Sequence, residues 1–197
     1  MTILYLVKGN LYVNITNRCP CSCTFCIRNE APGVYGSDSL WLEHEPSIDE
    51  IKSEFDRFDP ESYGEIVFCG YGEPTERLDV VCEIGKYVKS KFGKTVRINT
   101  NGLCNLINQK PCEPMFEGAV DIVSVSLNAP DKDEYNRITR PKWDNSFEEL
   151  LLFTKNVKPY VKKVVLTVVD VLKPDEIEQC RAIAEELGVD FRVRKLD

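Results

Sequence analysis

Four cysteines lie within eight residues of the chain, and thiols at this density indicate metal binding. They are Cys19, Cys21, Cys23 and Cys26. Iron–sulfur clusters are held by cysteine thiolates, usually four of them. A loop that supplies three thiolates leaves one iron of a four-iron cluster open to a substrate or cofactor, as a catalytic zinc site keeps one position open. A zinc site, or a closed cluster that uses all four thiolates, is the alternative, although Cys21 lies unusually close to Cys19 and Cys23 for tetrahedral ligation.

The composition describes an acidic chain that is able to bury a core. It has 197 residues, of which 43% are hydrophobic, and we expect one domain over residues 1–197. Acidic residues outnumber basic ones by 32 to 25, which gives a formal charge of −7. This balance argues against a broad nucleic-acid surface, because such a surface needs a positive face. Arg192 and Arg194 are either a small local basic patch or solvated surface residues.

The remaining sequence features favour a cytoplasmic protein. Residues 1–8 lack the basic start and cleavage site of a signal peptide, and no apolar run is long enough to cross a membrane. The nine cysteines are therefore not expected to form a disulfide framework. We interpret Cys104 and Cys112 as buried or incidental thiols, and we expect no auxiliary-cluster domain after the last strand.

Strand and helix patterns alternate almost to the end of the chain. Capping boxes at Ser47 and Ser146 mark two helix starts, and Gly93 and Gly188 mark two helix ends. The expected strands cover residues 3–7, 11–15, 66–69, 96–98, 122–127, 164–169 and 191–193, and the expected helices cover 47–58, 78–92, 103–116, 146–157 and 174–187.

These elements predict an α/β fold with a mostly parallel sheet, because crossover helices separate the strands. Six steps from strand to helix are too few for a closed eightfold barrel. We therefore expect an open partial (β/α)6 barrel, with a curved parallel sheet and outer helices, and a flavodoxin-like sheet is the alternative. The cysteines directly follow the first strand pair, at the edge where parallel sheets bind their ligands.

The cysteine spacing resembles the signature of the radical S-adenosylmethionine (SAM) superfamily. Cys19, Cys23 and Cys26 match the Cys-x-x-x-Cys-x-x-Cys pattern, and the aromatic Phe25 precedes the last cysteine. The resemblance implies a partial barrel of the radical SAM type. It also implies that these three cysteines hold a site-open [4Fe–4S] cluster and that Phe25 contacts SAM. Cys21 is not a ligand in this register.

A second motif follows the second crossover strand. Gly70, Tyr71, Gly72 and Glu73 resemble the glycine–glycine–glutamate segment that binds the amino group of SAM in this superfamily. An ammonium group is held by converging carbonyls and a carboxylate, and glycine lets the backbone come close. Tyr71 stands where many members have the first glycine, and we interpret it as variation rather than loss of the motif.

Three further strand ends complete the resemblance. Residues 99–102 match the family's Thr-Asn-Gly segment, which implies that Thr100 contacts SAM. Ser126 matches a position that contacts SAM in related enzymes, and Asn128 lies nearby. The strand over residues 164–169 would supply apolar and backbone contacts to adenine, and we assign Val168 to this role.

The resemblance implies a reaction as well as cofactors. The reduced cluster donates one electron to SAM, and the resulting 5′-deoxyadenosyl radical abstracts hydrogen from a substrate. The electron would come from flavodoxin or ferredoxin. The sequence most resembles small radical SAM proteins associated with TatD-type metal-dependent hydrolases, which implies a functional link to such a hydrolase. The alternatives are an activase that installs a radical on a partner protein and a non-catalytic zinc or iron–sulfur module.

The sequence does not identify the substrate. Residues 35–45 are candidates for substrate contacts or for a lid, although a single histidine is more often a surface residue. Polar residues near the expected mouth of the barrel are further candidates. The candidate substrate residues are Trp41, His44, Asn101, Asp170, Arg192 and Arg194.

Overall fold

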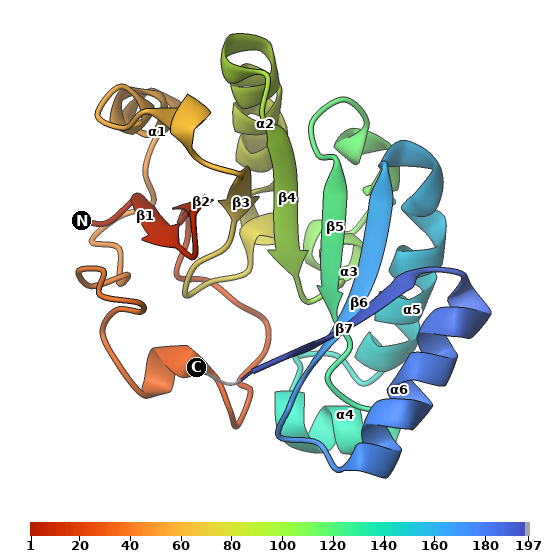
Figure 1. The fold of residues 1–197 in the computed structure, drawn as a ribbon. Coiled ribbons are helices and arrows are strands. Elements are labelled where there is room, and N and C mark those ends of the chain that lie inside the picture. Colours follow the sequence, from red (N-terminus) through yellow and green to blue (C-terminus); the bar gives the residue numbers. More distant parts are fainter. Residues whose placement is uncertain (196–197) are drawn as a thin grey trace.

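The computed structural model describes residues 1–195, in which seven strands form one sheet in the order of the sequence (Figure 1). The first two strands are antiparallel, and every later pairing is parallel. Within residues 1–195 no pairing joins the first strand to the last, so the sheet is an open barrel. The strands are β1 Leu4–Val7, β2 Asn10–Val13, β3 Glu65–Phe68, β4 Thr95–Thr100, β5 Ile122–Ser126, β6 Lys163–Val169 and β7 Asp190–Arg194.

Six α-helices among the described residues accompany the sheet, and in Figure 1 α5 and α6 run along its β5–β7 side. The expected partial barrel is confirmed, and its sequential strand order differs from the reversing order of a flavodoxin-like sheet. No helix within residues 1–195 combines the length and the apolarity required to span a bilayer. The helices are α1 Ile48–Phe55, α2 Leu78–Phe92, α3 Cys104–Asn108, α4 Lys132–Thr139, α5 Ser146–Asn156 and α6 Pro174–Leu187.

Local chemistry explains where the helices agree with the sequence and where they differ. The capping box at Ser47 is present, since its hydroxyl accepts a hydrogen bond from the Glu50 N–H. The box expected at Ser146 is absent, because the buried Ser146 hydroxyl donates to the Trp143 carbonyl instead. The helix expected over residues 103–116 ends early, at Gln109, which adopts a left-handed conformation.

The helix α4 was not expected from the sequence. It is short and largely polar, so it carries little of the apolar periodicity that indicates a helix. Its start is nonetheless well defined, because the side chain of Asp131 accepts a hydrogen bond from the Glu134 N–H at 2.9 Å. The helix matters for the site, since the cysteine loop is attached to its end.

The strand register separates two faces of the sheet. Residues such as Ile98, Val123 and Leu166 are fully buried in the main hydrophobic core. The residues between them along each strand point to the inner, concave face. On this face, Arg97 of β4 pairs in register with Ile122 of β5. Ser126 of β5 pairs with Thr167 of β6, which in turn pairs with Arg192 of β7. The concave face is therefore unusually polar, which suits a ligand site rather than a packed interior.

Candidate functional site

The cysteine loop is held in place by α4. The N–H of Ser22 donates to the Thr139 carbonyl at 3.0 Å, and the N–H of Thr24 donates to the Ile138 carbonyl at 2.8 Å. These bonds fix the middle of the loop over residues 19–26.

A cavity of about 560 Å³ lies on the concave face and brings most of the predicted site residues together. Its walls come from the cysteine loop, from the ends of β3, β4 and β5, and from β7. The sequence-predicted residues that line it are Cys19, Cys23, Phe25, Cys26, Gly70, Tyr71, Gly72, Glu73, Thr100, Asn101, Ser126, Asn128, Arg192 and Arg194.

Three of the loop thiols suit cluster binding, whereas the fourth is buried between them. Cys19, Cys23 and Cys26 are partly exposed, and Cys21 is only 4% exposed. Hydrogen bonding with the Cys21 thiol lowers the pKa of Cys19 and of Cys23, while burial raises the pKa of Cys26. Lower pKa values favour the thiolates that ligate iron. The side chain of Asn101 also contacts Cys21, with Nδ2 at 3.8 Å from Sγ.

The donor set of the cysteine loop consists of thiols, the ligands that hold iron–sulfur clusters. Within the part of the chain that the structure describes, no three His, Cys, Asp or Glu side chains converge on the position of one metal ion. Three thiolates that hold a four-iron cluster bind three different irons and need no such convergence. Cys19, Cys23 and Cys26 are therefore the residues that could hold the cluster.

The glycines of the second motif let its backbone pack directly on residues 14–18, which precede the cysteine loop. A Cβ atom at Gly72 would lie 2.3 Å from the Thr16 carbonyl oxygen and 2.6 Å from that of Arg18. A Cβ atom at Gly70 would lie 2.1 Å from Oδ1 of Asn14. Glu73, which follows Gly72, donates its N–H to the Arg18 carbonyl at 2.8 Å. Both glycines are thus needed for chain packing, whatever they do for a ligand.

The carboxylate of Glu73 joins the second and third motifs. It is 4% exposed, and Oε1 accepts hydrogen bonds from the Thr75 N–H, the Thr75 hydroxyl and the Thr100 hydroxyl. Oε2 accepts one bond, from the Asn101 N–H at 2.7 Å. Burial raises the pKa of Glu73, and these hydrogen bonds oppose the increase. Oε2 is the atom with capacity left to accept a bond from a ligand ammonium group.

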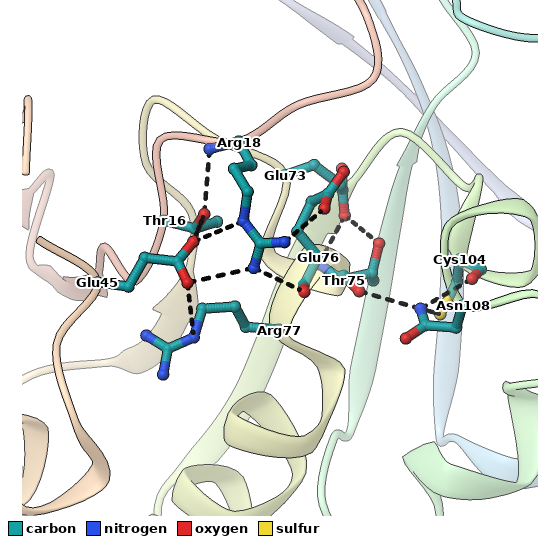
Figure 2. A network of polar contacts seen from close by, with 9 residues as sticks. All are labelled: Thr16, Arg18, Glu45, Glu73, Thr75, Glu76, Arg77, Cys104 and Asn108. Atoms are coloured by element: carbon teal, nitrogen blue, oxygen red, sulfur yellow. Dashed lines mark hydrogen bonds and ion pairs between the residues drawn. The ribbon is translucent and has the colours of Figure 1, made fainter.

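Figure 2 shows the charged residues that connect the segments around Glu73 through hydrogen bonds and ion pairs. Glu45 accepts hydrogen bonds from the Thr16 hydroxyl at 2.6 Å and from Nε of Arg18 at 2.7 Å. Arg18 also pairs with Glu76 at 3.3 Å, and Arg77 lies 3.7 Å from Glu45. The network connects the start of the cysteine loop to the segment before α1 and to the start of α2.

At the end of β5, Asn128 offers an unused acceptor to the cavity. Its backbone is left-handed, with φ of 60°, and the residue is 6% exposed. Its Oδ1 is buried and has no hydrogen-bond partner among the described residues. A buried polar atom without a partner is costly, and a donor on a bound ligand would satisfy it. Ser126 lies beside it on the cavity wall.

Val168, which the sequence analysis assigns to the adenine contacts, does not line the cavity. Val168 is fully buried in the hydrophobic core on the outer face of β6. Its neighbour Val169 does line the cavity. Side chains along β6 point alternately to the two faces of the sheet, so Val168 and Val169 lie on opposite faces.

Three of the six substrate candidates lie outside the cavity lining. His44 is exposed, and its Nε2 lies 2.9 Å from Oε1 of Glu50. Trp41 packs its ring against the ring of Tyr71, with the centroids 5.2 Å apart. Asp170 is exposed after the end of β6. The other three candidates, Asn101, Arg192 and Arg194, line the cavity.

Several cavity residues were missed by the sequence analysis. Tyr5, Tyr12, Arg97 and Asn99 line the cavity from β1, β2 and β4. Arg28 donates to the Tyr71 carbonyl at 3.4 Å and so approaches the second motif. The available signal was the period of two along each strand, in which polar Arg97 and Asn99 alternate with apolar neighbours.

Comparison with known proteins gives a consistent result. The family model of the Radical SAM superfamily matches residues 13–187. A GTP 3',8-cyclase from Lactiplantibacillus plantarum is 33% identical over 129 residues, which is 65% of this chain and 36% of that protein. The chain thus spans about a third of the length of this curated relative.

Solved structures share the fold at low sequence identity. Streptococcus suis SuiB, bound to the precursor peptide SuiA, has a TM-score of 0.67 and 14% identity, covering 98% of this chain and 40% of SuiB. The FeFe-hydrogenase maturase HydG from Carboxydothermus hydrogenoformans has a TM-score of 0.68 and 15% identity, covering 96% and 44% of the two chains. These similarities support the open, mostly parallel sheet described above.

Proposed function

Because the chain belongs to the radical SAM superfamily, we propose that it cleaves SAM reductively and uses the resulting radical on a substrate. It is an enzyme, and enzymes of this superfamily use a [4Fe–4S] cluster and SAM. We propose Cys19, Cys23 and Cys26 as the cluster ligands. We also propose that residues 1–197 act as one radical SAM core domain.

One observation carries the proposal: motifs that are far apart in the sequence line a single cavity and are hydrogen-bonded to one another. The backbone of Glu73 binds Arg18, directly before the cysteine loop, and its carboxylate binds Thr100 and Asn101 at the end of β4. A chance match to the cysteine pattern would not require these contacts. They support a common site for a cluster and an amino-acid cofactor.

The protein residues hold and orient the reactants. When bound, the reduced cluster and SAM together supply a 5′-deoxyadenosyl radical that abstracts hydrogen. Oε2 of Glu73 would accept a bond from the SAM ammonium group, and Oδ1 of Asn128 would accept one from another donor on SAM. Tyr71 is 4% exposed, and its hydroxyl donates to the Ala31 carbonyl, so its ring keeps the segment after the cysteine loop over the cavity. That cover would limit the access of water.

The test is anaerobic reconstitution with iron and sulfide, reduction with dithionite and detection of 5′-deoxyadenosine by mass spectrometry. We expect the product with the unchanged protein and with a Cys180→Ala control, since Cys180 is buried in α6, away from the cavity. We expect none with Cys19→Ala, Cys23→Ala or Cys26→Ala. Zinc binding without cluster formation would contradict the proposal and favour a metal-binding module.

An electron donor is part of the proposal. SAM cleavage consumes one electron per turnover, and we propose flavodoxin or ferredoxin as its source in the cytoplasm. Nine free cysteines, five of them buried, suit such a reducing compartment. Replacement of dithionite by a reduced flavodoxin system should sustain 5′-deoxyadenosine formation.

The link to a TatD-type hydrolase is proposed only from the sequence resemblance. Its test is co-purification or coupled turnover with such a hydrolase. An activase role would instead appear as a radical on a partner protein, detected by electron paramagnetic resonance.

The curated relative is named for GTP, whereas SuiB is seen with a peptide, so similar folds take different substrates. We propose that the cavity walls of this chain contribute to its substrate choice.

A further inference from the structure

Three arginines project onto the concave face at the β4 and β7 walls of the cavity. Arg97 lies on β4, and Arg192 and Arg194 lie two residues apart on β7. The register brings Arg192 level with Thr167 and Arg194 level with Val169. All three arginines line the same cavity as the cysteines.

The positive charge of these arginines is only partly balanced. Arg97 is 7% exposed, and its Nε pairs with Oε2 of Glu65 at 2.8 Å. Among residues 1–195, Arg192 and Arg194 have no ion pair, and the buried Nε of Arg194 has no hydrogen-bond partner. Arg192 is exposed and Arg194 is half-buried, and burial together with the charge of Arg192 lowers the pKa of Arg194. This concentration of positive charge occurs in a chain whose formal charge is −7.

The arginines face a different part of the cavity from the thiols of the cysteine loop. The titratable neighbours of Arg194 are Arg192 and Tyr12 on the strands, Cys69 directly after β3, and Tyr35 in the segment after the cysteine loop. The thiol of Cys23 is instead influenced by Cys21 and Arg28, within and beside the cysteine loop. The cavity therefore has a thiol end and an arginine end.

We infer that Arg97, Arg192 and Arg194 form a subsite for an oxyanion group, a phosphate or a carboxylate, on the substrate. The planar guanidinium group donates two parallel hydrogen bonds to such groups, and partial burial strengthens the interaction. An oxyanion would satisfy Nε of Arg194 and reduce the repulsion between the arginines. The inference rests on the proposed function, because it places the reacting molecule in the cavity that holds the cofactors.

Anion binding can be measured without knowledge of the substrate. Isothermal titration calorimetry would follow pyrophosphate, as the phosphate probe, and malonate, as the carboxylate probe, into the anaerobically reconstituted protein. We expect at least one probe to bind and to lose tenfold or more in affinity in Arg192→Gln and Arg194→Gln. Arg57→Gln is the matched control, because Arg57 is an exposed arginine that pairs with Glu54 on the surface. The affinity of Arg57→Gln for the probe should stay within twofold of that of the unchanged protein.

Two further measurements separate the possible outcomes. Equilibrium dialysis with SAM should give equal affinity in Arg192→Gln and in the unchanged protein, and thermal unfolding should show that both are folded. Arg192→Lys keeps the positive charge but loses the planar guanidinium group, so its affinity for the probe should lie between those of Arg192→Gln and the unchanged protein. Absence of binding by both probes, an equal loss in Arg57→Gln, or a matching loss of SAM affinity would overturn the subsite. Failure of SAM cleavage with intact anion binding would count against the proposed function alone.

Discussion

The carboxylate of Glu73, after the end of β3, accepts a hydrogen bond from the backbone N–H of Asn101, after the end of β4, at 2.7 Å. Adjacent parallel strands end at the same edge of a sheet, so this bond joins two loops that a ligand at that edge would touch. Thr100 donates to the other carboxylate oxygen and makes the link rigid. Glu73 is therefore a structural centre of the site as well as a candidate SAM contact.

Glu73→Gln should weaken both folding and SAM binding. An amide replaces one acceptor oxygen by a donor that faces the N–H or O–H groups around the carboxylate, at a cost of about 1–3 kcal/mol. Urea denaturation should show this loss, and equilibrium dialysis should show weaker SAM binding. Glu61→Gln, at an exposed position, is the control and should change neither. Unchanged stability in Glu73→Gln would mean that the four hydrogen bonds are not important.

Gly72→Ala should prevent the second motif from packing on the segment that leads into the cysteine loop. The added Cβ would meet two backbone carbonyl oxygens that no side-chain movement relieves, so we expect a cost of about 1–3 kcal/mol or more and a loss of bound iron. Gly93→Ala is the control, because Gly93 has open space around it and only a left-handed backbone, with φ of 62°. It should cost about 1–2 kcal/mol and keep the iron. Equal iron contents in the two variants would be evidence against the packing role.

Cys21 and Cys23 should behave differently although they lie two residues apart. Cys23→Ala should lose the cluster, because it removes a proposed iron ligand. Cys21→Ala should retain most of the iron, because the Cys21 side chain is buried against Asn101. Iron and sulfide content after anaerobic reconstitution measures both. Loss of the cluster in Cys21→Ala as well would favour a closed site with four ligands.

Asp121 should make stability depend on pH. Burial raises the pKa of this carboxyl, but hydrogen bonds from Lys89, the Val96 N–H and Lys162 outweigh it and place the pKa below its usual value. The stabilisation is therefore complete above about pH 4 and is lost as the pH falls through the lowered pKa. Asp121→Asn should cost about 1–3 kcal/mol near neutral pH.

The measurement for Asp121 is urea denaturation of the cluster-free protein at several pH values. The difference in unfolding free energy between the unchanged protein and Asp121→Asn should shrink below about pH 4, as the carboxyl takes up its proton. A difference that stays constant over the acid range would show that Asp121 does not provide this dependence. Asp133→Asn, on the surface of α4, is the control.

Tyr71 should keep the segment after the cysteine loop ordered. Its hydroxyl donates to the Ala31 carbonyl, and its ring packs edge-on against Trp41. Tyr71→Ala removes both contacts, so limited proteolysis within residues 29–46 should become faster. Tyr71→Phe keeps the ring but loses the hydroxyl, so its rate of proteolysis should lie between the rates of the unchanged protein and Tyr71→Ala. Proteolysis at the original rate in Tyr71→Ala would show that other contacts hold this segment.

The sequence by itself determined the α/β type of fold, the mostly parallel sheet and the candidate cluster ligands, whereas the structure decided between a sequential and a reversing strand order. These features depend on local patterns: apolar runs, helix signals and the spacing of Cys19, Cys23 and Cys26. The motif at residues 70–73 was also visible, because its glycines and glutamate are adjacent in the chain. The pairing of Glu73 with Asn101 was not, since those residues are brought together only by neighbouring strands.

Only the tertiary structure decided which side chains share the cavity. Val168 and Val169 are both plausible in the sequence, and the register of β6 alone puts Val169 on the cavity wall. The alternation along its strand marks Arg97 as a residue of the polar face, but the sequence does not show that β7, about a hundred residues later, lines the same cavity. His44 has a reactive side chain but lies on the surface beside Glu50. Contacts between distant strands are set by the global packing of the sheet, and local sequence patterns do not encode that packing.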